Sequence, residues 1–152
     1  EIRDRETMQS AISYAETGHL CISTLHANNA NQAIKRILNF FPEAMYPQLL
    51  MDLSLNLQAV VAQRLLTGTQ DSMVLAYEVM VRTAYIADLI RKGNINEIRA
   101  SIDKNADPDM QSFDQCLLGL YNKGLIDQQT ALDHADSKTE LNLKIRLAAA
   151  GR

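Results

Sequence analysis

LCISTLHANNANQAI, residues 20–34, is the stretch that decides the fold. Its first six residues are mostly apolar or β-branched, which predicts a strand over Leu20–Leu25 that is buried on both faces. Asn28 and Asn29 are favoured helix caps, and the apolar residues after them recur at helical spacing until Pro42. A strand that enters a helix through a short polar loop is typical of a wound α/β sheet, in which ligands bind at the carboxyl ends of the strands.

Further helices and a hairpin are expected around this unit. Asp4 can cap a helix that precedes the strand, and Gly18 is placed to end it. A longer amphipathic helix is predicted over about Glu43–Ala62, although residues 61–66 could instead be extended. A polar turn then leads into residues 73–81, which are rich in β-forming residues and predict a β-hairpin.

The pattern becomes wholly helical after Arg82. Two apolar stripes at helical spacing lead to stops at Gly93 and Gly124, and Asp127 can cap a last short helix. Residues from about Asp136 are expected to form a frayed helix or a tail. An α/β portion therefore precedes an all-helical portion.

The composition limits the classes of protein. The chain has 152 residues, 47% of them hydrophobic, and a formal net charge of −3. That size supports one domain with a hydrophobic core, and the mildly acidic balance disfavours a nucleic-acid partner. No long uncharged apolar run is present, which excludes a transmembrane span. The sequence begins at Glu1 with no Met and no signal-peptide pattern, so we expect a piece of a longer protein.

The glycines and cysteines form no recognisable site. The six glycines are scattered singly, and no G-x-x-x-x-G-K-[ST] phosphate-binding loop can be written through them. Cys21 and Cys116 each lie in an apolar run, which predicts reduced, buried thiols. His19, Cys21 and His26 match no zinc-ligand spacing, so no structural zinc is expected.

Glu1 and His26 are the candidate catalytic residues. His26 directly follows the predicted strand, and Glu1 lies on the same sheet edge if it closes a preceding strand. A carboxylate and an imidazole at one edge can align a water molecule or a metal-bound phosphate. His19 lies seven residues earlier, about 20 Å away along a strand and facing the opposite side. We therefore expect His19 to be structural or to face a neighbouring subunit.

The order of motifs resembles the retraction ATPases of bacterial type IV pili, the twitching-motility or PilT/PilU family. Residues 1–42, EIRDRETMQSAISYAETGHLCISTLHANNANQAIKRILNFFP, are similar to the end of that family's Walker B motif and to its histidine box. The resemblance continues through residues 48–66 and, more weakly, 110–126. The stretches HANNANQA and MDLSLNL look closer to the PilU branch. Residues 85–92 agree, since they read YIADLIRK where the PilT branch carries AIRNLIRE.

The resemblance implies a fold and a division of the chain. Residues 1–81 would be the C-terminal half of a RecA-like ATPase core, a mostly parallel sheet with flanking helices and a β-hairpin. Residues 82–152 would be an all-helical C-terminal region.

The resemblance also implies a function. The full-length protein would be a hexameric motor that hydrolyses ATP with Mg²⁺ and drives pilus retraction. It would lie at the cytoplasmic face of the bacterial inner membrane, peripheral to it, and meet a partner motor and a platform protein. Glu1 matches the Walker B glutamate near Mg²⁺, His26 the histidine that senses the γ-phosphate, and His19 the first histidine of the box. Without the Walker A loop, the 152 residues alone are expected to be inactive.

Two alternatives remain open at the level of sequence. One is a related ATPase that extends a pilus or serves type II secretion, since the motifs are shared in outline. The other is a non-catalytic interaction module whose helices over Met110–Ala135 mimic a helix-turn-helix, although the acidic balance argues against DNA.

Overall fold

The computed structural model describes residues 1–69, 72–104 and 108–150. These residues form helices and one two-stranded sheet, an α/β arrangement. In chain order the elements are α1 (Arg5–Glu16), α2 (Ala30–Leu38), the 3₁₀ turn η1 (Glu43–Met45), α3 (Tyr46–Asn56), β1 (Ala59–Thr67), β2 (Met73–Val81), α4 (Ala84–Arg91), the 3₁₀ turn η3 (Ile95–Glu97), α5 (Ile98–Lys104), α6 (Phe113–Asn122), α7 (Gln128–Asp133) and α8 (Lys138–Ala150).

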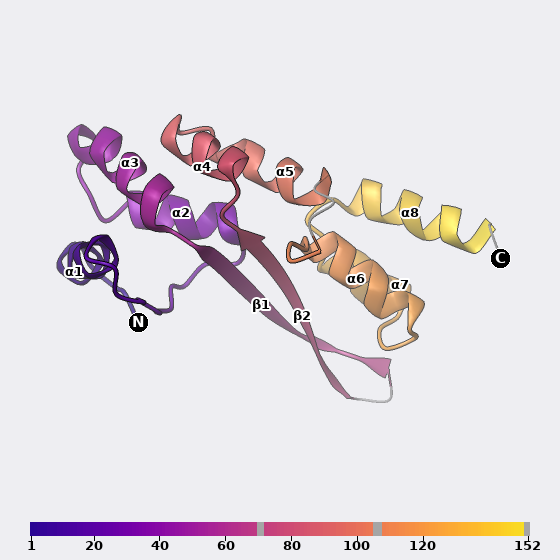
Figure 1. Ribbon diagram of the computed structural model, residues 1–152. Helices are drawn as coiled ribbons and strands as arrows, with labels where there is room; N and C mark the ends of the chain where they lie inside the picture. Colours follow the sequence, from indigo (N-terminus) through magenta and orange to yellow (C-terminus); the bar gives the residue numbers. More distant parts are fainter. Residues whose placement is uncertain (70–71, 105–107, 151–152) are drawn as a thin grey trace.

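The antiparallel hairpin β1–β2 connects the two groups of helices (Figure 1). Its register runs from the pair Ala59 and Val81 to the pair Thr67 and Met73. Side chains alternate between the two faces, so the even-numbered residues of both strands lie on one face. That face is buried or half-buried along both strands.

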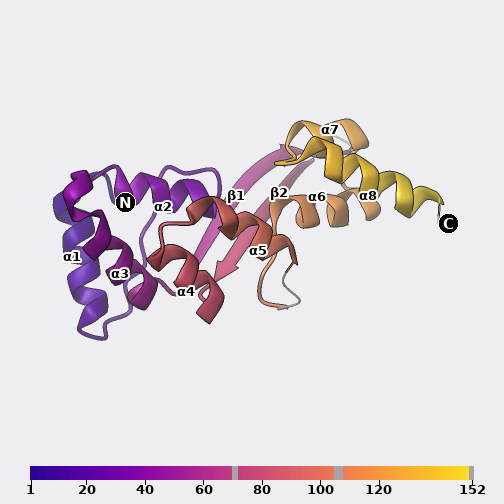
Figure 2. The ribbon, with the colours of Figure 1, turned by 90° about the horizontal axis from the view of Figure 1, so that it is seen from above.

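Two hydrophobic cores form along the buried face of the hairpin. The first joins α1–α5 to the Met80 end of β2, and the second joins α6–α8 to the other half of the hairpin. Seen from above, α1–α4 lie at one end and α6–α8 at the other (Figure 2). The fully buried side chains of the first core include Ile34, Met80, Ile86, Ile90 and Ile98, and those of the second include Leu66, Phe113, Leu117, Ile126 and Leu141.

The predicted helix starts are confirmed by their caps. The side chain of Asp4 accepts a hydrogen bond from Thr7 N, Asn29 from Gln32 N and Asp127 from Thr130 N. Each carboxylate or amide oxygen thereby satisfies a backbone donor that the first helical turn leaves free. After α1, Gly18 takes a φ of 86°, a conformation that glycine adopts without strain.

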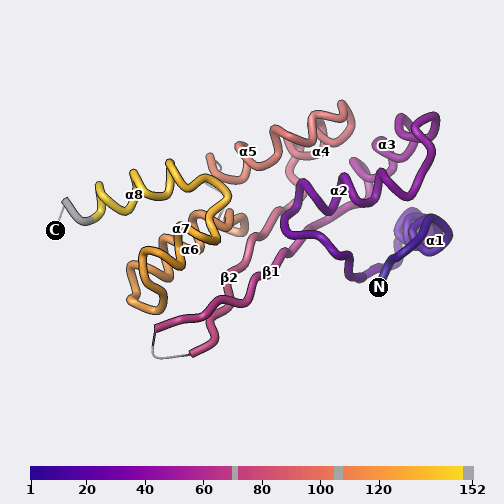
Figure 3. The backbone as a smooth tube through the Cα atoms, turned by 180° about the vertical axis from the view of Figure 1, so that it is seen from behind, coloured from indigo at the N-terminus to yellow at the C-terminus, as the bar shows by residue number. Residues whose placement is uncertain are grey.

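The strand predicted over Leu20–Leu25 is wrong. The chain crosses from α1 to α2 as an irregular extended segment (Figure 3), and Leu20 and Ile22 are each 84% exposed. Among the described residues its one backbone bond to a distant segment joins Ile2 N to Thr24 O, at 2.9 Å. A strand needs a ladder of such bonds, and β propensity alone does not supply a partner. Cys21, expected to be buried, is exposed with this segment, whereas Cys116 is buried as predicted.

Two further boundaries differ from the expectation. The helix predicted over Glu43–Ala62 ends at Asn56, because the residues from Ala59 pair with β2. The residues after Asp136, expected to form a frayed helix or a tail, form the helix α8, which buries Leu141 and Ile145 in the second core. Burial against α6 and α7 stabilises a helix that its own sequence pattern marks only weakly.

The packing of α8 can be tested by truncating its buried face. Leu141→Ala should lower the free energy of unfolding by about 2–5 kcal/mol, because it removes a fully buried side chain and leaves a cavity. Leu143→Ala is the matched control on the same helix, where the side chain is exposed, and should change it by no more than about 0.5 kcal/mol. Urea unfolding followed by circular dichroism measures both, and equal effects would show that α8 is not packed.

Candidate functional site

Glu1 and His26 meet where the N-terminus lies against the loop before α2. Ile2 is buried, and its bond to Thr24 O holds the two segments side by side. Ala27 N donates to Leu25 O, at 3.0 Å, which closes a tight turn around His26. The imidazole Nε2 of His26 lies 2.8 Å from Oε1 of Glu1. The expected proximity of the carboxylate and the imidazole is therefore confirmed, although no parallel strands in the described residues create it.

Arg3 is the main charged partner of this carboxylate. Its guanidinium binds the other oxygen of Glu1, and this hydrogen bond is the main reason that the pKa of Glu1 lies below its ordinary value. The charges of Arg3 and His26 lower that pKa further. The imidazole of His26 is 83% exposed and the carboxylate 24%, so both can reach a ligand. An ionised carboxylate beside an exposed imidazole can orient a water molecule or bind a cation.

His19 belongs to a different group of residues. Its ring Nδ1 lies 3.0 Å from the hydroxyl of Thr17, and the ring stands edge-on to Tyr14, with 6.1 Å between the ring centroids. These contacts place His19 on the exposed C-terminal end of α1. Its described partners do not include Glu1 or His26.

Two charged residues that the sequence patterns did not single out hold the loop of His26. The buried carboxylate of Glu78 accepts a hydrogen bond from Ala30 N, at 2.8 Å, at the start of α2. A guanidinium nitrogen of Arg64 donates to the carbonyl oxygen of Asn28, at 3.3 Å. Burial raises the pKa of Glu78, and this effect exceeds the opposing effect of the hydrogen bond from Ala30. One sequence signal could have identified Arg64 and Glu78: both are charged residues at even-numbered hairpin positions, where strand alternation favours apolar side chains.

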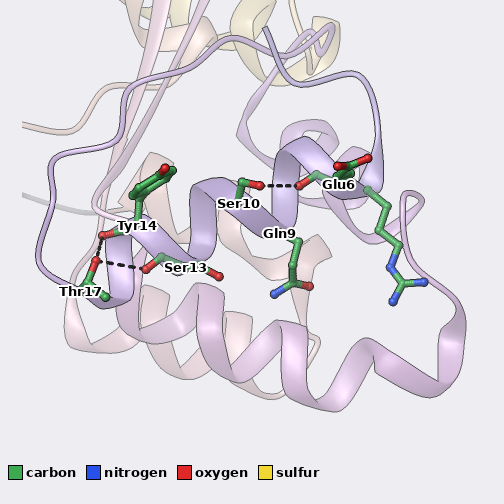
Figure 4. Close-up of a pocket in the computed structure, with 7 residues that line it drawn as sticks. Glu6, Gln9, Ser10, Ser13, Tyr14 and Thr17 are labelled. Carbon is green, nitrogen blue, oxygen red and sulfur yellow. Dashed lines mark hydrogen bonds between the residues drawn. The ribbon is translucent and has the colours of Figure 1, made fainter.

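A shallow hollow along α1 has no comparable chemistry (Figure 4). Two of its hydroxyl groups bond back to the helix itself: Ser10 donates to Glu6 O, and Thr17 donates to the carbonyl oxygens of Ser13 and Tyr14. Such back-bonding satisfies these two hydroxyls without a ligand. We therefore assign the site to Glu1 and His26.

The donors available for a metal are few. Within residues 1–69, 72–104 and 108–150, no three His, Cys, Asp or Glu side chains are grouped to hold a metal ion. A divalent cation at Glu1 would therefore need oxygen ligands from water or phosphate, which is the usual situation of Mg²⁺ at nucleotide sites.

In the same ranges, no helix has both the length and the apolar character needed to cross a bilayer.

The proteins similar in sequence to this chain include pilus and secretion ATPases. The model of the Type II/IV secretion system protein family matches residues 1–74. The Type IV pilus ATPase PilU of Pseudomonas aeruginosa is 49% identical over 98% of the chain, which covers 39% of PilU. The Type IV pilus retraction ATPase PilT of the same organism is 37% identical over 89% of the chain, which again covers 39% of that protein. The chain is homologous to the PilT/PilU retraction ATPases.

The higher identity to PilU than to PilT confirms the predicted closeness to the PilU branch. Solved structures agree with the PilT/PilU fold. The crystal structure of the pilus retraction motor PilT with bound ADP has a TM-score of 0.83 and 36% identity, covering 93% of the chain and 40% of PilT. The ATPase DotB of Yersinia pseudotuberculosis has a TM-score of 0.76 and 25% identity, covering 88% of the chain and 35% of DotB. The chain spans about two fifths of the length of the curated relatives PilU and PilT.

The effect of Arg3 on Glu1 can be measured directly. Arg3→Ala should raise the pKa of the Glu1 carboxyl toward its ordinary value, because the hydrogen bond and the positive charge that favour the carboxylate are lost. The variant carboxylate should therefore become protonated at a higher pH than in the parent chain. An NMR titration of the carboxyl carbon gives this pKa. Arg5→Ala is the control, since Arg5 stacks on Phe41; a matching shift in that variant would contradict the assignment to Arg3.

Proposed function

We propose that these residues belong to an ATP-hydrolysing motor that drives type IV pilus retraction and twitching motility. The observation that carries the proposal is the extent of the match to PilU, 98% of the chain at 49% identity. The TM-score of 0.83 to ADP-bound PilT supports it. The motor would act as a homohexamer at the cytoplasmic face of the bacterial inner membrane. It would meet a partner retraction motor and an inner-membrane platform protein.

The finer architecture is part of the same proposal. Residues 1–81 would be the second half of a RecA-like core whose sheet is mostly parallel, and residues 82–152 would be the helical C-terminal region. The likeness to PilT over 93% of the chain supports this division. Helix movement after ATP hydrolysis would then be transmitted through residues 82–152 to the pilus machinery.

Glu1 would orient the attacking water at the γ-phosphate of ATP. Its carboxylate, whose pKa Arg3 lowers below the ordinary value, can accept a hydrogen bond from water. The same oxygens fit a Mg²⁺ site, and the ion would neutralise charge that develops on the phosphate oxygens. His26 would donate from Nε2 to the γ-phosphate after leaving its contact with Glu1. His19, whose ring is on the exposed end of α1, would face a neighbouring subunit.

A related ATPase for pilus extension or type II secretion is the second candidate. The Type IV pilus assembly ATPase PilB of Pseudomonas aeruginosa is 42% identical, and the type II secretion system protein E of that organism is 45% identical. Each of these matches covers 43% of the chain, against 98% for PilU. The broader match therefore favours retraction.

The role of Glu1 is tested in the full-length protein. Glu1→Gln should lower ATP turnover at least about 100-fold, because an amide cannot take up a proton from the attacking water. ATP affinity should be preserved, since the substitution keeps the size and polarity of the side chain. A coupled phosphate-release assay and equilibrium binding of a fluorescent ATP analogue measure the two quantities. Near-normal turnover would remove Glu1 from the catalytic site.

His26 and Cys21 form a matched pair of exposed side chains on one segment. His26→Ala should lower turnover in the full-length protein, whereas Cys21→Ala should leave it close to the parent value. The same phosphate-release assay compares them, and a larger loss with Cys21→Ala would overturn the placement of the site. The 152-residue chain by itself should show no Mg²⁺-dependent turnover above background, because it contains no phosphate-binding loop.

A further inference from the structure

Arg64 and Glu78 place opposite charges on the buried face of the hairpin. Arg64 pairs with Ala76 across the ladder and Glu78 pairs with Ala62, so the two charged side chains are diagonal neighbours. The side chain of Arg64 is 19% exposed, and Glu78 is 2% exposed. They lie between Met80, which belongs to the first core, and Leu66, which belongs to the second. Charges at this junction are costly to bury and need specific partners.

The guanidinium of Arg64 joins two separate segments, the loop before α2 and the turn between α7 and α8. It donates to the carbonyl oxygen of His134 at 2.6 Å, to Oδ1 of Asp136 at 2.7 Å and to the carbonyl oxygen of Asn28 at 3.3 Å. Its carbon atom Cζ lies 3.8 Å from the centre of the Phe113 ring. The planar fork of an arginine can make these contacts together, which a lysine ammonium cannot.

The Asp136 side of this network is tightly held. The buried carboxylate of Asp114 accepts hydrogen bonds from Asp136 N at 2.8 Å and from Ser137 N at 3.0 Å. Arg99, from α5, donates to the same carboxylate at 3.0 Å. The turn between α7 and α8 is therefore a fixed anchor for Arg64.

The third acceptor of Arg64, the carbonyl oxygen of Asn28, lies in the same loop as His26. Asn28 lies two residues after the histidine, and its own N–H donates to the side chain of Gln32. Glu78 holds Ala30 N on the other side of the loop. Arg64 and Glu78 thus fix the short segment that joins His26 to α2, using bonds that come from the hairpin.

We propose that Arg64 is a positioning residue that sets the place of His26 relative to the turn between α7 and α8. This inference rests on the proposed role of His26 at the γ-phosphate. Arg64 does not touch the nucleotide; it acts through the Asn28 carbonyl, and it links the histidine loop to the C-terminal helices. Its loss lowers turnover by misplacing the imidazole and leaves ATP binding unchanged.

Two substitutions in the full-length protein separate the contacts of Arg64. Arg64→Met keeps apolar volume over Phe113 and removes all three hydrogen bonds. Arg64→Lys keeps the charge, and its single ammonium pairs with Asp136, since a carboxylate is a stronger partner than a carbonyl. Arg36→Met is the matched control, because Arg36 also stacks on an aromatic ring, Phe40, at 5.5 Å, on the exposed side of α2.

Steady-state ATP turnover and peptide-level hydrogen exchange are the two readouts. We expect both Arg64 variants to lower kcat about 10- to 100-fold with KM within about twofold of the parent. Both should exchange faster in residues 26–30. In residues 134–138, Arg64→Met should exchange faster and Arg64→Lys should match the parent. The control variant should match the parent in both measurements.

These measurements test the role of Arg64 separately from the proposed ATPase function. Parent-like turnover in Arg64→Lys, despite faster exchange in residues 26–30, would overturn the positioning role. Unchanged exchange in residues 26–30 of Arg64→Met would overturn the link itself. If the parent protein does not hydrolyse ATP, the proposed function fails and the positioning role for turnover fails with it. The exchange data then still decide whether Arg64 fixes the histidine loop.

Discussion

The half-buried guanidinium of Arg64 is the constraint on which the arrangement of the molecule depends. The hairpin buries apolar side chains at both of its ends, and in the middle it carries the half-buried Arg64 and the buried Glu78. A charge in that position destabilises the fold unless each of its donors finds an acceptor. The acceptors come from the loop before α2 and from the turn before α8. Satisfying one side chain therefore fixes how the two groups of helices sit on the hairpin.

The Glu1 site, unlike the surroundings of Arg64, is open to solvent. Its two functional groups are close, at 2.8 Å, but the imidazole is largely exposed and few contacts surround it. Ile2 is the buried residue that keeps Glu1 in place, and the bond to Thr24 carries the alignment of the two segments. An accessible carboxylate–imidazole pair on a supported backbone suits binding of a substrate that arrives from solvent. The rigid part of the site lies behind it, in the loop that Glu78 and Arg64 hold.

Local signals in the sequence were sufficient for most of the helices and for the hairpin. Asp4, Asn29 and Asp127 bond within their own first turns, so their caps depend only on neighbouring residues. The strand over Leu20–Leu25 failed because strand formation depends on a partner backbone, which a single segment cannot reveal. Proximity of Glu1 and His26 was predicted from a shared sheet edge, whereas in the described residues it comes from the backbone bond between Ile2 and Thr24. The contacts of Arg64 could not, since Asn28 and Asp136 are 36 and 72 residues away in sequence.

The two cores have a consequence for how the chain loses structure. Each core is a separate apolar cluster, and the hairpin with its polar middle connects them. Apolar contact is what makes neighbouring elements unfold together, so the polar junction marks a boundary between two cooperative units. We expect the group α6–α8 to open while α1–α5 stay folded around the Met80 end of the hairpin. We therefore expect thermal unfolding of this chain to proceed in two partial transitions that share one pair of strands.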